Sequence, residues 1–290
     1  MKTILLWNLV NKKTEMKYLI LATILISLGC SSKKENDYKF QPTICSPDEM
    51  PKFDGNKVTI LNDNGKPLKD TILGGIEKRR TVFKPCRELI YKAEFKTETS
   101  NLISDSRIKI MAKGKRWQFQ PEKQDEILIQ YEFTQDDFDR NKKHQLNKEI
   151  MSDKWAGEIT EGVIENIERI WMHPFRFNQY NFTQVAPFPE VKLPLNIGKS
   201  WTGTLHIQEG WGDWENTHKY SEYEVVDRET IETIFGVIED CWKIESKAKF
   251  ELGQSTFDYW FNEKLGFVKM NYKNYGNQTL EIELAEVKEN

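Results

Sequence analysis

The sequence predicts a mainly β protein: a large curved antiparallel sheet or incomplete barrel with one or two short helices, after an N-terminal lipoprotein signal peptide. Two observations support this prediction. Apolar and polar residues alternate with period two through most of the C-terminal half, and a short apolar run near the N-terminus ends in a cysteine. Alternation of this kind is typical of strands with one face in the core and one in water, as in antiparallel sheets.

The N-terminal segment has the properties of an export signal. The sequence from Met16 to Cys30 is MKYLILATILISLGC, in which one lysine precedes an apolar run over residues 18–28. That run has the length of a signal-peptide core and is too short to span a bilayer. Ser27-Leu28-Gly29-Cys30 resembles the bacterial lipobox, although Ser27 stands where the motif usually has leucine. The alternatives are an ordinary cleavable signal and a single membrane anchor.

The lipobox resemblance implies cleavage before Cys30 and a covalent diacylglycerol/acyl lipid on that residue, with the diacylglycerol on its sulfur. We expect no other cofactor. Met16 is the predicted true start, because a signal peptide of normal proportions begins there. We expect a lipid-anchored protein of the bacterial cell envelope, on the outer membrane, with the membrane face left open. The run that includes Lys33-Lys34 is similar to surface-export signals of some Bacteroidetes lipoproteins, and a plain solvated linker is the alternative.

Four segments follow from these patterns. Residues 1–29 are the predicted signal peptide, 30–38 the lipidated cysteine and tether, 39–98 a small N-terminal β segment, and 99–290 the antiparallel β domain. Three cysteines remain after Cys30. Cys45 and Cys86 are the more plausible disulfide pair in an exported protein, and Cys241 fits a buried thiol within a strand.

The clearest alternation extends from Cys241 to Leu252, where one face is apolar and the other charged. The apolar face consists of Trp242, Ile244, Ala248, Phe250 and Leu252, and the charged face of Lys243, Glu245, Lys247, Lys249 and Glu251. We expect further strands over residues 127–133, 201–208, 257–261, 268–273 and 280–284, with turns at 262–266 and 275–277. The C-terminal half is therefore predicted to be a meander of long hairpins.

Two local patterns precede that meander. Val58–Leu61 followed by Asn62-Asp63-Asn64-Gly65 predicts a small hairpin. Thr134-x-x-Asp137 resembles a capping box, and it predicts a helix over residues 134–151.

Composition argues against a nucleic-acid partner. The chain has 290 residues with 42 Lys+Arg and 45 Asp+Glu, so its formal charge is 42 − 45 = −3, and its basic residues form no separate stretch.

The sequence motifs of several common catalytic and metal sites are incomplete or missing. The Gly198-Lys199-Ser200 segment lacks the first glycine of a P-loop, because Leu193 stands there. No CxxC, HxH or HExxH spacing supports a metal site, and no G-x-S-x-G elbow supports a hydrolase.

One cluster and one loop remain as candidates for function. An enzyme would use His173 as a base oriented by Glu165, whereas the simpler interpretation is a histidine that serves the fold. The segment Gly210-Trp211-Gly212-Asp213-Trp214 could expose two indole rings, which suit stacking on a sugar ring or an apolar ligand. The alternative is that Trp211 and Trp214 fold back to cap the barrel. Trp201 and Tyr220 are the expected neighbours of this binding site.

Several fragments resemble uncharacterised bacterial lipoproteins with a large antiparallel sheet. The residues are 194–201 (PLNIGKSW), 235–244 (FGVIEDCWKI), and Tyr259-Trp260-Phe261 with Gly266-Phe267-Val268-Lys269, within about residues 159–286. The resemblance implies an incomplete barrel similar to periplasmic lipoprotein-carrier half-barrels. It favours a non-enzymatic binding or envelope-assembly module with an apolar concave surface, a small apolar ligand and an unknown envelope partner. A glycan-binding accessory protein that uses Trp211 and Trp214 is the alternative, and a hydrolase the third.

Overall fold

A computed structural model of the chain describes residues 37–45, 57–62, 64, 66–72, 81–150 and 154–289. The expectations for the signal peptide, the start at Met16, the lipid on Cys30 and most of the tether fall on residues outside this described part.

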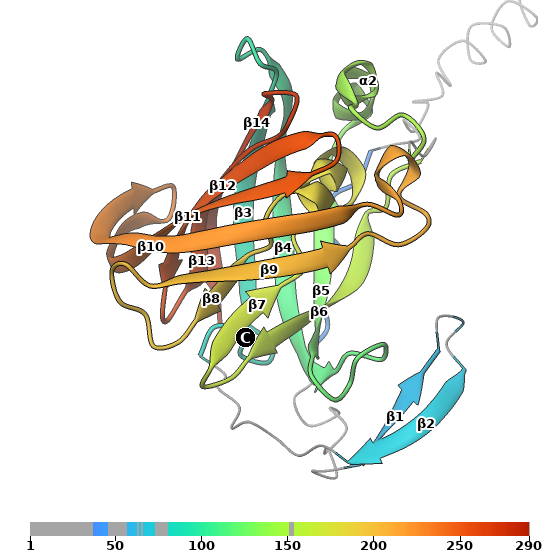
Figure 1. Cartoon of the computed structure of the whole chain (residues 1–290), viewed down its shortest axis with the longest axis vertical. Coiled ribbons are helices and arrows are strands. Elements are labelled where there is room, and N and C mark those ends of the chain that lie inside the picture. The colour runs from blue at the N-terminus through green and yellow to red at the C-terminus, as the bar shows by residue number, and fades with distance from the viewer. Residues whose placement is uncertain are drawn as a thin grey trace, which may run out of the picture. The chain divides into compact units, whose positions relative to one another are not determined.

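A 12-stranded antiparallel sheet forms the body of the protein and nearly closes into a barrel (Figure 1). Its strands, in spatial order, are β8 (Glu190–Lys192), β7 (Arg169–Met172), β6 (Glu158–Glu165), β5 (Asp125–Glu132), β4 (Leu102–Arg116), β3 (Glu88–Lys96), β14 (Thr279–Lys288), β13 (Gly266–Lys273), β12 (Gly253–Asn262), β11 (Gly236–Phe250), β10 (His218–Thr233) and β9 (Ser200–His206). The predicted fold class is confirmed. Because β3 pairs with β14, the N-terminal and C-terminal meanders form one continuous sheet.

The two edge strands, β8 and β9, follow one another in the sequence, and each pairs on one side only. We call the gap between them the seam. The seam is where the barrel remains incomplete.

The predicted hairpin and capping box are both confirmed. β1 (Lys57–Leu61) pairs with β2 (Pro67–Ile72) in a separate two-stranded sheet. Helix α2 (Gln135–His144) begins after Thr134, whose hydroxyl accepts from the backbone N–H of Asp137 while the Asp137 side chain accepts in return from the N–H of Thr134. The helix ends before the expected Met151, because Gln145 already has extended backbone angles.

The expected phase of alternation in β11 is partly wrong. Cys241 and Ile244 are buried, whereas Trp242 is half-buried and Leu252 lies exposed in the turn after the strand. Irregular pairing on the facing strand, between Val225 and Asp227 and again between Glu229 and Ile231, shifts the register opposite this part of β11. A register shift changes which side chains face the core, so a strict period of two fails there.

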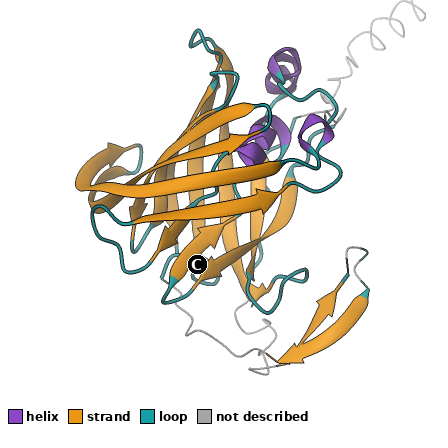
Figure 2. Ribbon diagram, in the orientation of Figure 1, coloured by secondary structure: helices purple, strands orange, loops and turns teal. Residues whose placement is uncertain are grey.

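The concave face of the sheet is filled by the protein's own chain. A 3-10 helix, η1 (Asn178–Val185), is buried there, and it appears as a helical segment within the strands in Figure 2. Phe182 stacks on Phe95 of β3 with ring centroids 5.3 Å apart, and Tyr180 contacts Tyr131 of β5 and Ser106 of β4. The apolar concave surface expected from the sequence is therefore occupied by these side chains.

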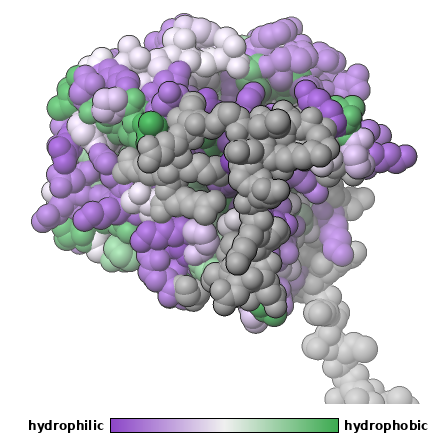
Figure 3. Space-filling view, turned by 90° about the horizontal axis from the view of Figure 1, so that it is seen from below, coloured by the Kyte–Doolittle hydropathy of each residue, from purple (hydrophilic) through white to green (hydrophobic). Residues whose placement is uncertain are grey.

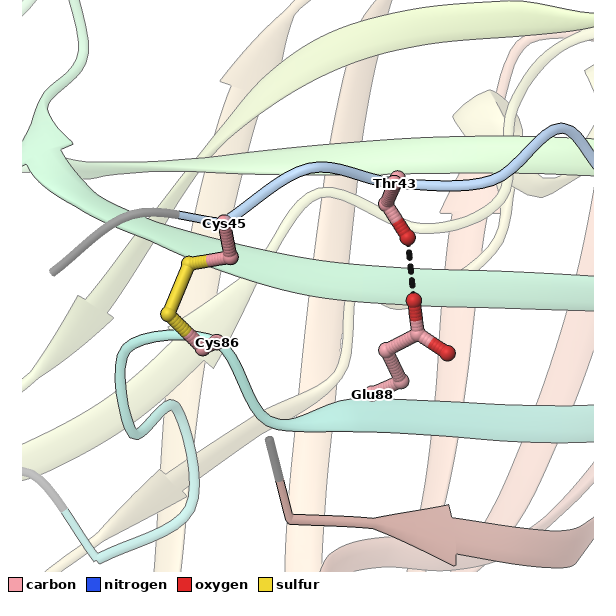
Figure 4. Close-up of a disulfide and its surroundings, with 4 residues drawn as sticks. All are labelled: Thr43, Cys45, Cys86 and Glu88. Carbon is pink, nitrogen blue, oxygen red and sulfur yellow. Dashed lines mark hydrogen bonds between the residues drawn. A yellow bond between two sulfur atoms is a disulfide. The ribbon is translucent and has the colours of Figure 1, made fainter.

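The N-terminal part of the described chain is tied to the outside of the sheet. Tyr38 pairs with Phe133, and a disulfide joins Cys45 to Cys86, just before β3 (Figure 4). Thr43 contacts Glu88 beside this disulfide. Because β3 belongs to the large sheet, the domain boundary drawn at Glu98 falls in the turn between two neighbouring strands.

The outer surface is mostly polar, as one-sided strands require. Where Figure 3 shows the described residues of one face, hydrophilic side chains predominate and smaller hydrophobic patches lie between them. β5 differs, because the segment before Cys45 covers its outer side. Gln130 is buried and accepts a hydrogen bond from the backbone N–H of Gln41.

Candidate binding site at the seam

The seam holds a cavity of about 420 Å³. Both edge strands and their neighbours β7 and β10 line it, together with the segment that leads from β7 into η1. A cavity of this size is typical of small-ligand sites. Its position follows from topology, because it lies where the sheet ends on both sides.

The cavity lining is strongly cationic. Its charged side chains are Lys123, Arg169, Arg176, Lys192, Lys219 and Glu190, which gives five cations and one carboxylate. Arg169 lies 3.6 Å from Glu190, and Arg176 is paired behind the cavity. No carboxylate among the described residues forms an ion pair with Lys123, Lys192 or Lys219. An anionic ligand would supply the missing negative charge.

A buried network supports one wall of this cavity. Nδ1 of His173 lies 2.9 Å from Oε2 of Glu161, and Arg176 donates to the same carboxylate through Nε at 2.9 Å and Nη2 at 3.0 Å. A two-pronged contact of this kind fixes both groups in orientation as well as in charge. Glu161 is only 2% exposed, so the carboxylate is removed from water.

Burial and charge shift the pKa values of this network in definable directions. Burial would raise the pKa of Glu161, but the hydrogen bonds and positive charges of His173 and Arg176 outweigh it and lower the pKa. Burial is the main cause of the lowered pKa of His173, against the opposing effect of Glu161. The rings of Trp171 and Trp117 contribute to that burial, with centroids 4.6 and 5.3 Å from the imidazole.

Lys219 is the most unusual side chain of the cavity. It is 3% exposed, and its ammonium donates to the carbonyls of Gln184 at 3.0 Å and Ala186 at 2.5 Å. The ammonium also lies 3.6 Å from the ring centroid of Phe188, a cation–π contact. Burial and the positive charge of Arg176 hold the pKa of Lys219 well below its usual range. Lysine is rarely buried without a carboxylate partner, so Lys219 makes this cavity the candidate functional site.

The pair that an enzyme would need, His173 and Glu165, does not converge. His173 lies beside Glu161, while the carboxylate of Glu165 accepts three backbone N–H groups, from Thr81 at 2.7 Å, Val82 at 2.9 Å and Phe83 at 2.8 Å. Glu165 therefore holds the chain that leads into β3. It does not orient the imidazole.

The four predicted binding residues lie in different places. Trp214 is buried, and its Nε1 donates to the hydroxyl of Tyr275 at 3.0 Å. Trp201 is 7% exposed and stacks on Tyr223, with centroids 5.3 Å apart. Tyr220 is exposed on the outer face of β10. These residues form no common platform.

Trp211 lines a second cavity, of about 360 Å³, beside α2. Its ring is half-buried, lies 5.8 Å from the Arg176 guanidinium, and shares the cavity with Trp155 and Asn141. Asn141 is buried, and its Nδ2 has no hydrogen-bond partner in the described part of the chain. Arg176 thus borders both cavities.

Sequence reasoning missed Lys219 and Glu161. Lys219 shares its strand face with the buried residues Ser221, Tyr223 and Val225. The burial of Lys219 could have been predicted from this alternation, because residues two apart in a strand point to the same side. Glu161 gives no comparable local pattern.

The described residues contain no group of three or more His, Cys, Asp or Glu side chains arranged to hold a metal ion. Within the same part of the chain, the helices are too short or too polar to cross a membrane.

No family model matches the sequence, and no curated protein matches it either. Some solved structures are similar to this chain at low TM-scores. One is described as an exported protein with a YmcC-like fold from Bacteroides fragilis, with a TM-score of 0.44 and 10% identity over 74% of this chain and 100% of that one. Another is described as a lipoprotein from Parabacteroides distasonis, with a TM-score of 0.40 and 11% identity over the same shares. A LolA superfamily protein from Nitrosomonas europaea has a TM-score of 0.27 and 8% identity, over 72% and 89%.

Proposed function

We propose that this chain is an exported, lipid-anchored binding protein of the bacterial envelope, attached through Cys30, whose seam cavity takes an anionic ligand. The lipobox at residues 27–30 supports the anchor, and the disulfide between Cys45 and Cys86 fits an oxidising compartment. The role is binding, without catalysis. The outer membrane is the proposed location.

One observation carries the ligand class: the amino group of Lys219 is buried without a carboxylate partner among the described residues, in a cavity that four further basic side chains line. Burial of an unpaired charge costs free energy. An anion in the cavity would offset that cost and would also meet Lys192 and Lys123. The rings of Trp171, Phe188 and Tyr223 add apolar contact area for a ligand that carries a ring.

Thermal unfolding of the mature protein in mild detergent tests this proposal, with phenyl phosphate and citrate as probes and sodium chloride at matched ionic strength as the reference. Both anions should raise the Tm of the wild type. Lys219→Met should abolish this shift, and Lys192→Met should reduce it without disturbing a buried group. The matched control, Lys249→Met on the exposed face of β11, should keep it. Equal Tm values in probe and in chloride for the wild type would contradict the proposal.

Glycan binding is a second candidate, and it rests on the cavity beside α2. The half-buried ring of Trp211 can stack on a sugar, and the unpartnered Nδ2 of Asn141 can donate to a hydroxyl. A glycan array with wild type and Trp211→Ala separates the candidates. Binding that is lost in Trp211→Ala and kept in Lys219→Met would favour the glycan role.

A further inference from the structure

The edge strand β9 presents unpaired backbone groups to the seam. It pairs with β10 along its full length, from Ser200 to His206, with no irregularity. The N–H of Ile207 donates to the carbonyl of Thr217, and the N–H of Val225 donates to the carbonyl of Lys199. In an antiparallel ladder such pairs alternate along the strand, so odd-numbered residues of β9 bond to β10. The N–H and C=O groups of Thr202 and Thr204 therefore point into the seam.

This edge lacks the features that normally keep sheet edges from pairing. Residues 201–205 contain no charge, no proline and no bulge. Proteins usually protect a free edge with one of these devices, or by making the strand very short. The opposite edge is protected in that way, because β8 has three residues between Pro189 and Pro194. The contrast indicates that β9 is kept available for pairing.

We propose that β9 pairs with an extended acidic segment of a partner protein, which adds a strand to the sheet at the seam. This inference rests on the proposed function and specifies its anionic ligand. Strand addition uses the backbone for affinity and alternate side chains for specificity. Side chains of the added strand opposite Trp201 and Gly203 would point inward, as these residues do, toward the cavity that holds Lys219.

The local geometry leaves room for those side chains. A Cβ placed on Gly203 would have its nearest neighbour at 4.0 Å, on the ring of Tyr223, so this position does not crowd the cavity. Acidic side chains entering there would meet Lys219, Arg169 and Lys192. Charge also argues against a second copy of this chain as the occupant, because pairing two β9 strands would bring two cationic seams together.

A labelled, acetylated nine-residue peptide of alternating Glu and Val is the probe, with fluorescence anisotropy on the mature protein as the readout. We expect the peptide to bind. Its affinity should fall at least tenfold when the alternate backbone nitrogens that would donate to β9 are methylated. A peptide of alternating Lys and Val should bind at least tenfold more weakly. Thr204→Pro removes one seam-facing N–H while leaving the β9–β10 ladder, and it should weaken binding in the same way, whereas Thr204→Val should not.

Each other outcome has a definite meaning. If methylated and unmethylated acidic peptides bind alike and Lys219→Met weakens both, strand pairing is overturned while the anion site stands. If the peptide fails to bind and phenyl phosphate binds, the partner is not an extended peptide. If neither binds, both proposals fail. A concentration-dependent dimer that Thr204→Pro disrupts would identify a second copy as the occupant and overturn the inference.

Discussion

The imidazole of His173 lies 2.9 Å from the carboxylate of Glu161. Glu161 lies in β6 and His173 directly follows β7, so both residues are on the same side of the seam. Arg176 completes the cluster by donating twice to that carboxylate. His173 and Arg176 line the seam cavity, so this cluster supports one of its walls.

Replacing Glu161 with glutamine should destabilise the protein by about 3 kcal/mol, because Arg176 would lose its partner in a buried site. Urea unfolding of the two proteins measures this difference. The exposed pair of Glu222 and Lys247, with nitrogen and oxygen 2.9 Å apart, supplies the control. Glu222→Gln should leave the unfolding free energy unchanged within error. Equal effects of the two substitutions would show that the buried network contributes no special stability.

Acid should weaken the fold through His173. Its pKa is lower in the folded protein than the ordinary value of 6.5, so the unfolded chain binds the proton more readily. The free energy of unfolding should therefore fall as pH decreases from 7.5 through 6.5 to 5.5. His173→Gln should lack most of this dependence, and the exposed His206→Gln should keep it. The same slope in both variants would assign the effect to other groups.

Anion binding should be coupled to proton uptake by Lys219. Burial and the positive charge of Arg176 hold its pKa well below the usual range, and an anion in the cavity would favour the charged form. Calorimetric titration with phenyl phosphate at pH 8.5, in buffers of different ionisation enthalpy, should show uptake of protons. Affinity should fall as pH rises further. Lys219→Met should abolish the uptake, and uptake that persists in this variant would point to another group.

Loss of the disulfide should destabilise the protein by about 4 kcal/mol. Cys45 and Cys86 are 41 residues apart, and constraint of such a loop in the unfolded chain accounts for this amount in the loop-entropy description. Guanidinium unfolding of the Cys45→Ser/Cys86→Ser double variant measures it. The reference is the wild type treated with a reductant, which should be equally weakened. If reduction leaves the unfolding free energy unchanged, the crosslink does not stabilise the fold.

The antiparallel meander was predictable because each strand has one face in the core and one in water. Apolar and polar residues therefore alternate along each strand. The phase errors in β11 arose where irregular pairing on β10 moved Cys241 inward and left Trp242 half-buried. Such shifts depend on the partner strand, so the sequence of β11 alone does not reveal them.

The candidate site was harder to predict because it depends on closure of the sheet. The pairing of β3 with β14 brings β8 and β9 to the two sides of one seam, and only then do Arg169 and Lys219 line one cavity. Glu165 illustrates the limit. A carboxylate close to a histidine in the sequence suggests a catalytic pair. The carboxylate of Glu165 instead accepts hydrogen bonds from three backbone N–H groups that are more than 80 residues away in the sequence.

Native mass spectrometry of the protein extracted from its own membranes tests the binding role of the seam most directly. The predicted result is a chain that begins at a lipidated Cys30 and carries an anionic adduct, identified after release. The adduct should be missing from a Lys219→Met/Lys192→Met variant prepared in parallel. A wild-type protein without an adduct, or one whose adduct is retained unchanged in the variant, would contradict an anion site at the seam.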